Sequence, residues 1–294
     1  MTSYDLSGRS ALITGASLGL GFAIARRFCA SGADLFLCAR GIDRLEKSVS
    51  ELEKLKTRAD QKILYRQADV SKADEVKDLV SDALKAFPNL TALVSNAGVY
   101  GPKGKIEEVS LEEFWGAIEI NLLGPILLSR ELIPHFRMQN YGKIIQISGG
   151  GATNPMPRLE SYATSKAAVV RLMESLALDL QRSRVDVNSI SPGLLDTRLL
   201  DEVLAAGPQK VGEQFYSRMK SAKEEGSSTD PEIGAKLCEF LASSASDGIT
   251  GKLISAVWDD YTKWPEHLSE LTGKDLYTLR RITGRDRQIN WGDK

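Results

Sequence analysis

The stretch from Ser10 to Gly21 constrains the fold of this 294-residue chain more than any other part of it. It opens with a short apolar run, Ala-Leu-Ile, that is typical of a buried parallel strand, and helical spacing begins at its far end. Between them lie Gly15, Gly19 and Gly21. A strand, a glycine turn and a helix in this order predict a phosphate cradle. Backbone N–H groups can approach a pyrophosphate where no Cβ intervenes, and the helix N-terminus adds partial positive charge.

The spacing of these glycines is Gly-x-x-x-Gly-x-Gly, which differs from the Gly-x-Gly-x-x-Gly of the commonest dinucleotide fold. With Thr14 in front of it, the motif resembles the opening of the short-chain dehydrogenase/reductase superfamily, in its single-domain oxidoreductase branch. The branch of sugar epimerases and dehydratases has Gly-x-x-Gly-x-x-Gly instead. The resemblance implies that this turn binds NADP or NAD, through Gly15, Ser17, Leu18, Gly19, Leu20 and Gly21.

Composition limits the class of protein. The 38 Lys and Arg residues nearly balance the 39 Asp and Glu residues, which argues against a general nucleic-acid or membrane-surface binder. The three cysteines are odd in number and widely spaced, so we expect reduced core thiols and no metal site. The first residues lack the pattern of a signal peptide, and no run approaches the ~20 apolar residues of a membrane span. We therefore expect a soluble cytoplasmic protein.

Apolar runs of strand length alternate with helical patterns along the chain, which predicts a parallel, doubly wound sheet with helices on both faces. We expect one Rossmann-type α/β domain of about seven strands over residues 1–294, with its core at about 6–256. Ligands bind such a sheet at the carboxyl ends of its strands. After the first strand, strands are predicted at 34–39, 62–70, 91–95, 142–148, 185–190 and 249–256, and helices at 43–58, 73–87, 111–139 and 161–181.

The end of the predicted strand 34–39 bears on the choice between NADP and NAD. An Asp or Glu at this place would bind the ribose 2′-hydroxyl of NAD, but the chain has Ala39 and Arg40. A guanidinium offers a planar fork of donors that suits a 2′-phosphate, so NADP is favoured and NAD stays possible. The alternative is that Arg40 only opens a solvated loop. Leu18 weakens the case slightly, since NADP-preferring relatives often have a basic residue there.

Further cofactor contacts follow from the resemblance alone. It places Asp69 and Val70 beside the adenine, although Asp69 is equally suited to cap the next helix. The Asn-Ala-Gly after the fourth strand and the Pro-Gly after the sixth match motifs of the family, and Thr197 matches a residue that often touches the carboxamide or the phosphates. The cofactor residues implied in this way are Asp69, Val70, Asn96, Ala97, Gly98, Pro192, Gly193, Leu195 and Thr197.

Tyr162 and Lys166 are four residues apart in a predicted helix, so their side chains share one face. A nearby ammonium favours the ionised form of a tyrosine, which then exchanges protons near neutral pH. The resemblance makes Tyr162 the proton donor and Lys166 the residue that lowers its pKa and binds the nicotinamide ribose. It also makes Asn121 the residue that holds a water beside the lysine. An asparagine inside a helix is unfavourable unless its side chain has a specific partner.

The serine that normally completes this site is displaced. Relatives commonly carry it thirteen residues before the tyrosine, at position 149, which is a glycine in this chain. Ser148 precedes that position by one residue, and in a regular strand it would point away from the cofactor. Because Gly149 and the two glycines after it permit a bulge or a positive φ, we predict that Ser148 is re-aimed at the substrate. The alternative is that backbone N–H groups of the glycine loop stabilise the oxyanion.

These observations predict an NADP-dependent oxidoreductase that interconverts a carbonyl and a secondary alcohol on a small molecule. The alternatives are a nucleotide-sugar epimerase or dehydratase, disfavoured by the glycine spacing, and a cofactor-binding protein without turnover. From the resemblance we expect a homodimer or homotetramer formed through the helices that hold Asn121 and Tyr162.

Two segments remain. Residues 194–229 are expected to form a mobile substrate loop, and Leu199, Leu200, Phe215, Tyr216 and Met219 line a pocket there or form a small helical core. The C-terminal extension, 257–294, holds too many large apolar groups for a free terminus. We expect it to dock over the substrate loop, across a subunit interface, or as a cap on the core.

Overall fold

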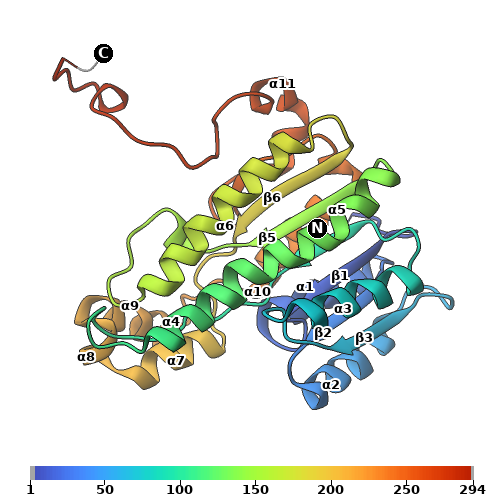
Figure 1. The fold of residues 1–294 in the computed structure, drawn as a ribbon, viewed down its shortest axis with the longest axis horizontal. Helices are drawn as coiled ribbons and strands as arrows, with labels where there is room; N and C mark the ends of the chain where they lie inside the picture. The colour runs from blue at the N-terminus through green and yellow to red at the C-terminus, as the bar shows by residue number, and fades with distance from the viewer. Residues whose placement is uncertain (1–3, 293–294) are drawn as a thin grey trace.

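A computed structural model describes residues 4–292, and it shows a sheet of seven parallel strands between two layers of helices (Figure 1). The strand order is β3-β2-β1-β4-β5-β6-β7, which confirms the predicted doubly wound sheet. Two strands are shorter than predicted, the third and the last. The bounds are β1 Ser10–Thr14, β2 Asp34–Ala39, β3 Ile63–Gln67, β4 Ala92–Ser95, β5 Gly142–Ile147, β6 Val185–Ser191 and β7 Leu253–Ser255.

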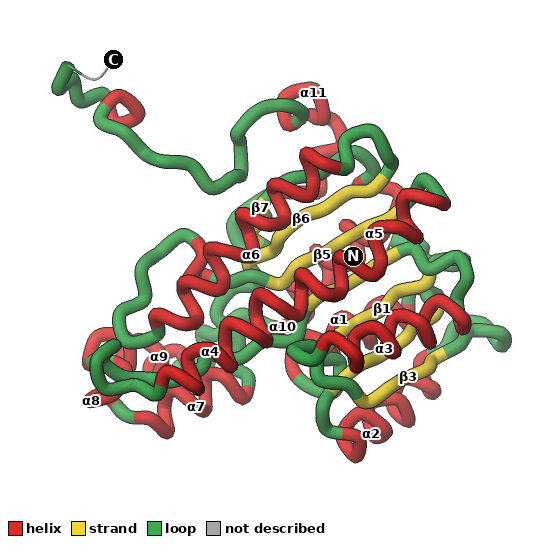
Figure 2. The backbone as a smooth tube through the Cα atoms, viewed as in Figure 1, coloured by secondary structure: helices red, strands yellow, loops and turns green. Residues whose placement is uncertain are grey.

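Except at the edge strand β3, the sheet buries both of its faces, as the continuous apolar runs of its strands predict. In β1, Ala11 and Ile13 point into one core and Leu12 into the other, because successive side chains alternate. Helices cover both faces (Figure 2). The first core is covered by α1 (Gly19–Ala30), α2 (Ile42–Leu52) and α10 (Pro231–Ala242), and the second by α3 (Ala73–Ala86), α5 (Gly124–Met138) and α6 (Glu160–Asp179).

The strand order reverses at β1, which pairs with β2 on one side and with β4 on the other. The chain runs outward from β1 to β3 and then returns to build the other half of the sheet. At such a switch point the loops after neighbouring strands diverge to opposite faces and leave a crevice between them. The glycine turn after β1 therefore lies at this crevice.

The helix predicted over 111–139 is interrupted. It consists of α4 (Leu111–Ile118), a π-helical turn at Glu119–Leu123, and α5. Asn121 is the middle residue of the π turn. Single π turns inside helices are rare and occur frequently at functional sites. A continuous helical pattern does not reveal such a turn, because the hydrophobic spacing on either side of it stays close to helical.

The segment 194–229 is helical where the sequence predicts a loop. It forms α7 (Arg198–Ala206), α8 (Pro208–Val211) and α9 (Glu213–Glu224), which lie with α4 at one end of the molecule (Figure 1). Leu200 and Met219 are buried in a small core of their own. The small helical core is thus the arrangement that the structure shows, although some of these side chains also line the cleft described below.

The C-terminal extension docks on its own subunit. Trp264 and Leu271, at the end of the short helix α11 (Leu268–Leu271), are buried in the core beneath α1 and α10. Farther on, the N–H of Leu253 in β7 donates to the carbonyl of Tyr277 at 2.8 Å. The N–H of Leu279 donates to the Glu174 carboxylate of α6 at 2.6 Å, and after these contacts the chain extends away from the body of the molecule (Figure 1). The part of the extension around Trp264 and Leu271 is therefore a cap on the core, whereas Trp258, Ile282 and Trp291 are exposed.

The three cysteines, Cys29, Cys38 and Cys238, are buried and free, as their spacing predicts. None of the helices within residues 4–292 has the length and apolar character that a membrane crossing requires. In the same part of the chain no group of His, Cys, Asp and Glu side chains is arranged to hold a metal ion.

Candidate active site

A cleft of about 1880 Å³ runs along the carboxyl edge of the sheet. It is lined by the segments that follow β1, β2, β3, β4, β5 and β6, together with α9 and part of the C-terminal extension. Among the predicted catalytic and cofactor-binding residues, Asn121 alone does not line it. The candidates that do are Gly15, Ser17, Leu18, Gly19, Leu20, Gly21, Arg40, Asp69, Val70, Asn96, Ala97, Gly98, Ser148, Tyr162, Lys166, Pro192, Gly193, Leu195 and Thr197.

The glycine turn has the shape of a phosphate cradle. Gly15 and Gly19 have φ angles of 65° and 53°, a conformation that side chains rarely adopt. A Cβ on Gly21 would lie 2.2 Å from the Gly15 carbonyl oxygen, so only glycine allows α1 to approach β1 this closely. The first turn of α1 has no acidic residue and no side-chain cap. Its backbone N–H groups therefore remain for an anion, and the turn fits the pyrophosphate of a dinucleotide.

Asn96 fastens this turn to the next strand. Its side-chain amide donates to the carbonyls of Thr14 at 2.9 Å and Gly15 at 3.2 Å. In return, the Thr14 hydroxyl accepts from the backbone N–H groups of Asn96 at 3.1 Å and Ala97 at 3.2 Å. These bonds join the carboxyl ends of β1 and β4 at the switch point. Asn96 thus holds the cradle in shape.

Two arginines lie in the part of the cleft that follows β2. Arg40 and Arg44 both line the cleft, and neither forms an ion pair with a carboxylate of residues 4–292. Sequence reasoning missed Arg44, although a second arginine four residues after Arg40, in the first turn of α2, is visible in the sequence. The Asp69 carboxylate accepts from the N–H and the hydroxyl of Ser71 at 3.0 and 2.8 Å, so it also shapes the turn before α3.

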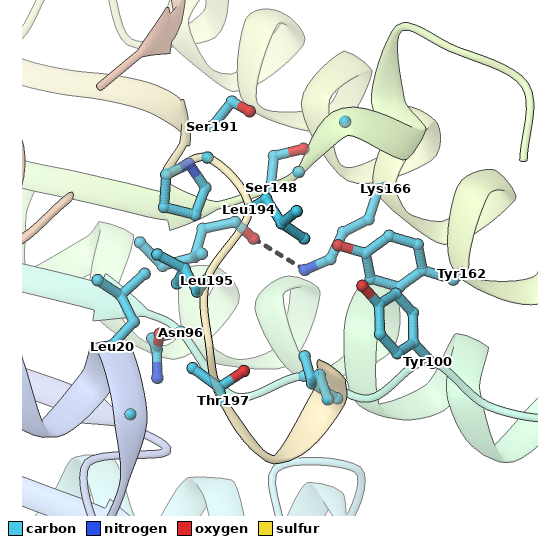
Figure 3. A pocket seen from close by; sticks show the side chains of 18 of the residues that line it. Leu20, Asn96, Tyr100, Ser148, Tyr162, Lys166, Ser191, Leu194, Leu195 and Thr197 are labelled. Atoms are coloured by element: carbon cyan, nitrogen blue, oxygen red, sulfur yellow. Dashed lines mark hydrogen bonds between the residues drawn. The ribbon is translucent and has the colours of Figure 1, made fainter. Parts of the chain in front are cut away.

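Tyr162 and Lys166 lie together on α6, both buried. The Lys166 ammonium donates to the Ile147 carbonyl at 2.9 Å (Figure 3) and lies 5.7 Å from the centroid of the Tyr162 ring. Burial lowers the pKa of Lys166 to about 8. Burial, and then the neighbouring Tyr100, raise the pKa of Tyr162 above its ordinary value. The pKa of Tyr162 is therefore raised where the sequence predicts a lowering, because burial disfavours the charged phenolate.

Asn121 has the specific partners that an asparagine inside a helix needs. Its side-chain nitrogen donates to the Val99 carbonyl at 2.8 Å and to the Ser165 hydroxyl at 3.0 Å. Its side-chain oxygen accepts from the Val99 N–H at 2.9 Å. The side chain is fully buried and is committed to these bonds. These bonds tie the loop after β4 to α6, and the role of holding a water beside Lys166 stays a prediction.

Ser148 is not re-aimed as predicted. Its N–H donates to the Ile190 carbonyl at 2.8 Å, so the pairing of β5 with β6 continues through it without a bulge. Its hydroxyl has no hydrogen-bond partner in the described part of the chain, and in Figure 3 it points away from the Tyr162 hydroxyl. A Cβ on Gly149 would lie 2.4 Å from the Tyr162 hydroxyl oxygen. The position that faces the tyrosine is thus 149, which has no side chain.

Comparison with known proteins agrees with this site. The family model described as short chain dehydrogenase matches residues 9–206, more than half of the chain. The chain therefore belongs to the short-chain dehydrogenase/reductase superfamily. It is an NAD(P)-dependent oxidoreductase that interconverts an alcohol and a carbonyl.

Individual relatives share this class. The chain is 34% identical over 249 residues to L-fucose dehydrogenase of Oryctolagus cuniculus, which covers 82% of this chain and 81% of the relative. It is 32% identical to glucose 1-dehydrogenase of Gluconobacter oxydans, over 84% of this chain and 90% of the relative. A crystal structure of NAD+-bound xylitol dehydrogenase matches with a TM-score of 0.77 at 25% identity, over 85% of this chain and 98% of the other.

Proposed function

We propose that this protein is an NADP(H)-dependent oxidoreductase that transfers a hydride to or from a small-molecule carbonyl or secondary alcohol. The observation that carries the choice of NADP is the pair of guanidinium groups, Arg40 and Arg44, without carboxylate partners in the described chain. No acidic side chain ends β2, where it would repel a 2′-phosphate. Arginine binds phosphate through two parallel charge-assisted hydrogen bonds, which are about twice as strong as neutral ones.

The bound cofactor supplies the hydride, and the protein's own residues handle the proton. Tyr162 is a neutral phenol at neutral pH because its pKa is raised, so it can donate a proton to the oxygen of a carbonyl. The Lys166 ammonium then lies beside the phenolate that forms and favours it. Burial of both groups keeps bulk water away from this transfer.

The alternatives lack such support. An epimerase or dehydratase acting on nucleotide sugars is disfavoured by the glycine spacing of the cradle. A cofactor-binding protein without turnover has no need of a buried Tyr162 and Lys166 on one helix face, since holding a lysine out of water costs free energy.

The test is oxidation of NADPH and of NADH against a panel of carbonyl compounds that includes aldoses and ketoses, since several relatives are named as sugar dehydrogenases. We expect turnover with NADPH that exceeds turnover with NADH. Tyr162→Phe keeps the ring and removes the hydroxyl that donates the proton, so this variant is expected to bind NADPH and to lose turnover. Binding of NADPH without turnover on any carbonyl would overturn the assignment of an enzyme, and a preference for NADH would overturn the choice of NADP.

We also propose a homodimer or homotetramer formed through α5 and α6. The support is a set of large apolar side chains exposed on these helices and on α4, where a monomer would leave them in water. Light scattering on the eluted protein measures the mass directly, and a monomer at micromolar concentration would contradict the proposal. The exposed side chains are Leu111, Trp115, Ile126, Met138 and Leu178.

A further inference from the structure

The site has no side-chain hydroxyl from β5 in the place that faces Tyr162. Position 149 is a glycine, and the Ser148 hydroxyl points elsewhere (Figure 3). A carbonyl being reduced gains negative charge on its oxygen, and enzymes commonly meet that charge with more than one preorganised donor. The structure therefore raises the question of which group assists Tyr162.

Tyr100 is that neighbour. It follows the Asn-Ala-Gly motif after β4, and its ring packs edge-on against the ring of Tyr162, with centroids 4.6 Å apart and an interplanar angle of 62°. Figure 3 shows both hydroxyls directed to the same part of the cleft, beside the Lys166 ammonium. Within residues 4–292 neither hydroxyl forms a hydrogen bond with another protein group. Two phenol O–H groups are thus free to bind one ligand atom.

The loop that carries Tyr100 is held firmly. Two hydrogen bonds join the backbone of Val99 to the Asn121 side chain, and the Ser161 hydroxyl donates to the Tyr100 carbonyl at 3.3 Å. Gly101 has a φ of 73°, and a Cβ there would lie 2.6 Å from atoms of two neighbouring side chains. The loop therefore lies too close to α4 and α6 to move freely. Because its loop is already held in place, the Tyr100 hydroxyl would lose little entropy when it binds a substrate.

We propose that the Tyr100 hydroxyl is the second hydrogen-bond donor to the substrate oxygen, in the place that a serine takes in relatives. The inference rests on the proposed oxidoreductase function. While the carbonyl carbon accepts the hydride, its oxygen takes the proton of Tyr162, so one O–H bond breaks and another forms. Tyr100 keeps its own proton and donates a hydrogen bond to the same oxygen throughout.

The protonation of Tyr100 suits this role. Burial, and then the carboxylate of Glu202, raise its pKa to about 12, so the phenol stays neutral at physiological pH. The cations nearby are Lys166 and Lys103, whose ammonium lies 5.8 Å from the Tyr100 ring and 3.4 Å from Glu202. A phenol that stays protonated at physiological pH can donate a hydrogen bond there without giving up its own proton.

The experiment is Tyr100→Phe, which keeps the ring and removes only the oxygen. We expect kcat for carbonyl reduction to fall about 10²-fold, the loss typical of removing one transition-state donor. The melting temperature and the affinity for NADPH, followed by its fluorescence, are expected to stay unchanged. Tyr65→Phe removes an exposed hydroxyl on β3, outside the cleft, and is the matched control.

The outcomes separate the two proposals. Normal kcat for Tyr100→Phe, with Tyr162→Phe inactive, would overturn the role of Tyr100 and leave the oxidoreductase intact. A 10²-fold loss on Ser148→Ala with normal Tyr100→Phe would return the role to the serine. A wild-type protein without turnover on any carbonyl would overturn both proposals.

Discussion

The Tyr162 hydroxyl occupies the space that a side chain at position 149 would fill. The substitution Gly149→Ala tests this directly. The φ of Gly149 is 165°, an extended conformation that alanine adopts without strain. Any effect of the substitution must therefore come from contact. The new Cβ would lie 2.4 Å from the Tyr162 hydroxyl oxygen, whereas ordinary contacts of a Cβ begin at 3.4 Å.

The structure sets the size of the effect. To restore an ordinary contact the Tyr162 hydroxyl oxygen must move by about 1 Å. Because the ring is buried, it cannot readily turn to bring the oxygen back to its former place. A misplacement of ~1 Å at a reacting group costs on the order of 10²-fold in rate, or about 2.7 kcal/mol of transition-state stabilisation. Overpacking of this kind costs ~1–3 kcal/mol of stability as well. We expect kcat to fall about 10²-fold while the affinity for NADPH stays the same.

The assay is steady-state carbonyl reduction, together with a fluorescence titration of NADPH and a thermal unfolding curve. Gly150→Ala is the control, because a Cβ there meets no atom within 4 Å. Gly149→Ser makes the same clash, so replacing the glycine with the residue that relatives carry is expected to lower turnover. Full activity in Gly149→Ala, or a gain in Gly149→Ser, would refute the reasoning.

Three further predictions follow from the cleft and the extension. Arg40→Ala is expected to lower kcat/KM for NADPH by the equivalent of ~1.5–3 kcal/mol and to leave kcat/KM for NADH unaffected. Arg26→Ala, at an exposed position outside the cleft, is the control. An equal loss with both cofactors, or a loss in the control, would argue against the 2′-phosphate contact. Because burial lowers the pKa of Lys166 to about 8, its ammonium loses its proton as the pH rises through that value. Reductive kcat/KM is therefore expected to fall above pH ~8, and a flat profile up to pH ~10 would show that the charge is not needed. Removing residues 281–294 is expected to leave the melting temperature unchanged. Removing residues 258–294 takes Trp264 from the core and is expected to lower the melting temperature by ~10 °C. Equal thermal unfolding curves for the two truncated proteins would contradict the docking of the extension.

The sheet and the cradle could be predicted because short stretches of sequence determine them. Gly21 sits where only glycine allows a helix to approach a strand, and this need is visible in the spacing itself. Tyr162 and Lys166 meet because they are four residues apart on one helix. In each case the residues that cooperate are near neighbours along the chain, and the local geometry is regular.

The parts that could not be predicted depend on packing between distant segments. The direction of Ser148 depends on whether β5 keeps pairing with β6, and that pairing is settled by residues some forty positions away. Tyr100 reads as an ordinary loop aromatic until its ring is seen against Tyr162. The interruption of the helix at Asn121 is likewise decided by its bonds to Val99 and Ser165, which no hydrophobic pattern records.

The family match ends at residue 206, and this boundary passes through the cleft. Every residue proposed here to hold the cofactor lies before it, whereas α9 and Tyr277 line the cleft from beyond it. The residues beyond 206 also complete the fold, because β7 extends the sheet and α10 packs in the core with α1, so this part of the chain supplies both walls of the cleft and part of the core. We expect a chimera that joins residues 1–206 of this chain to the corresponding C-terminal part of a relative to keep the proposed nucleotide site and to change the walls of the cleft, provided that the new α10 packs on α1.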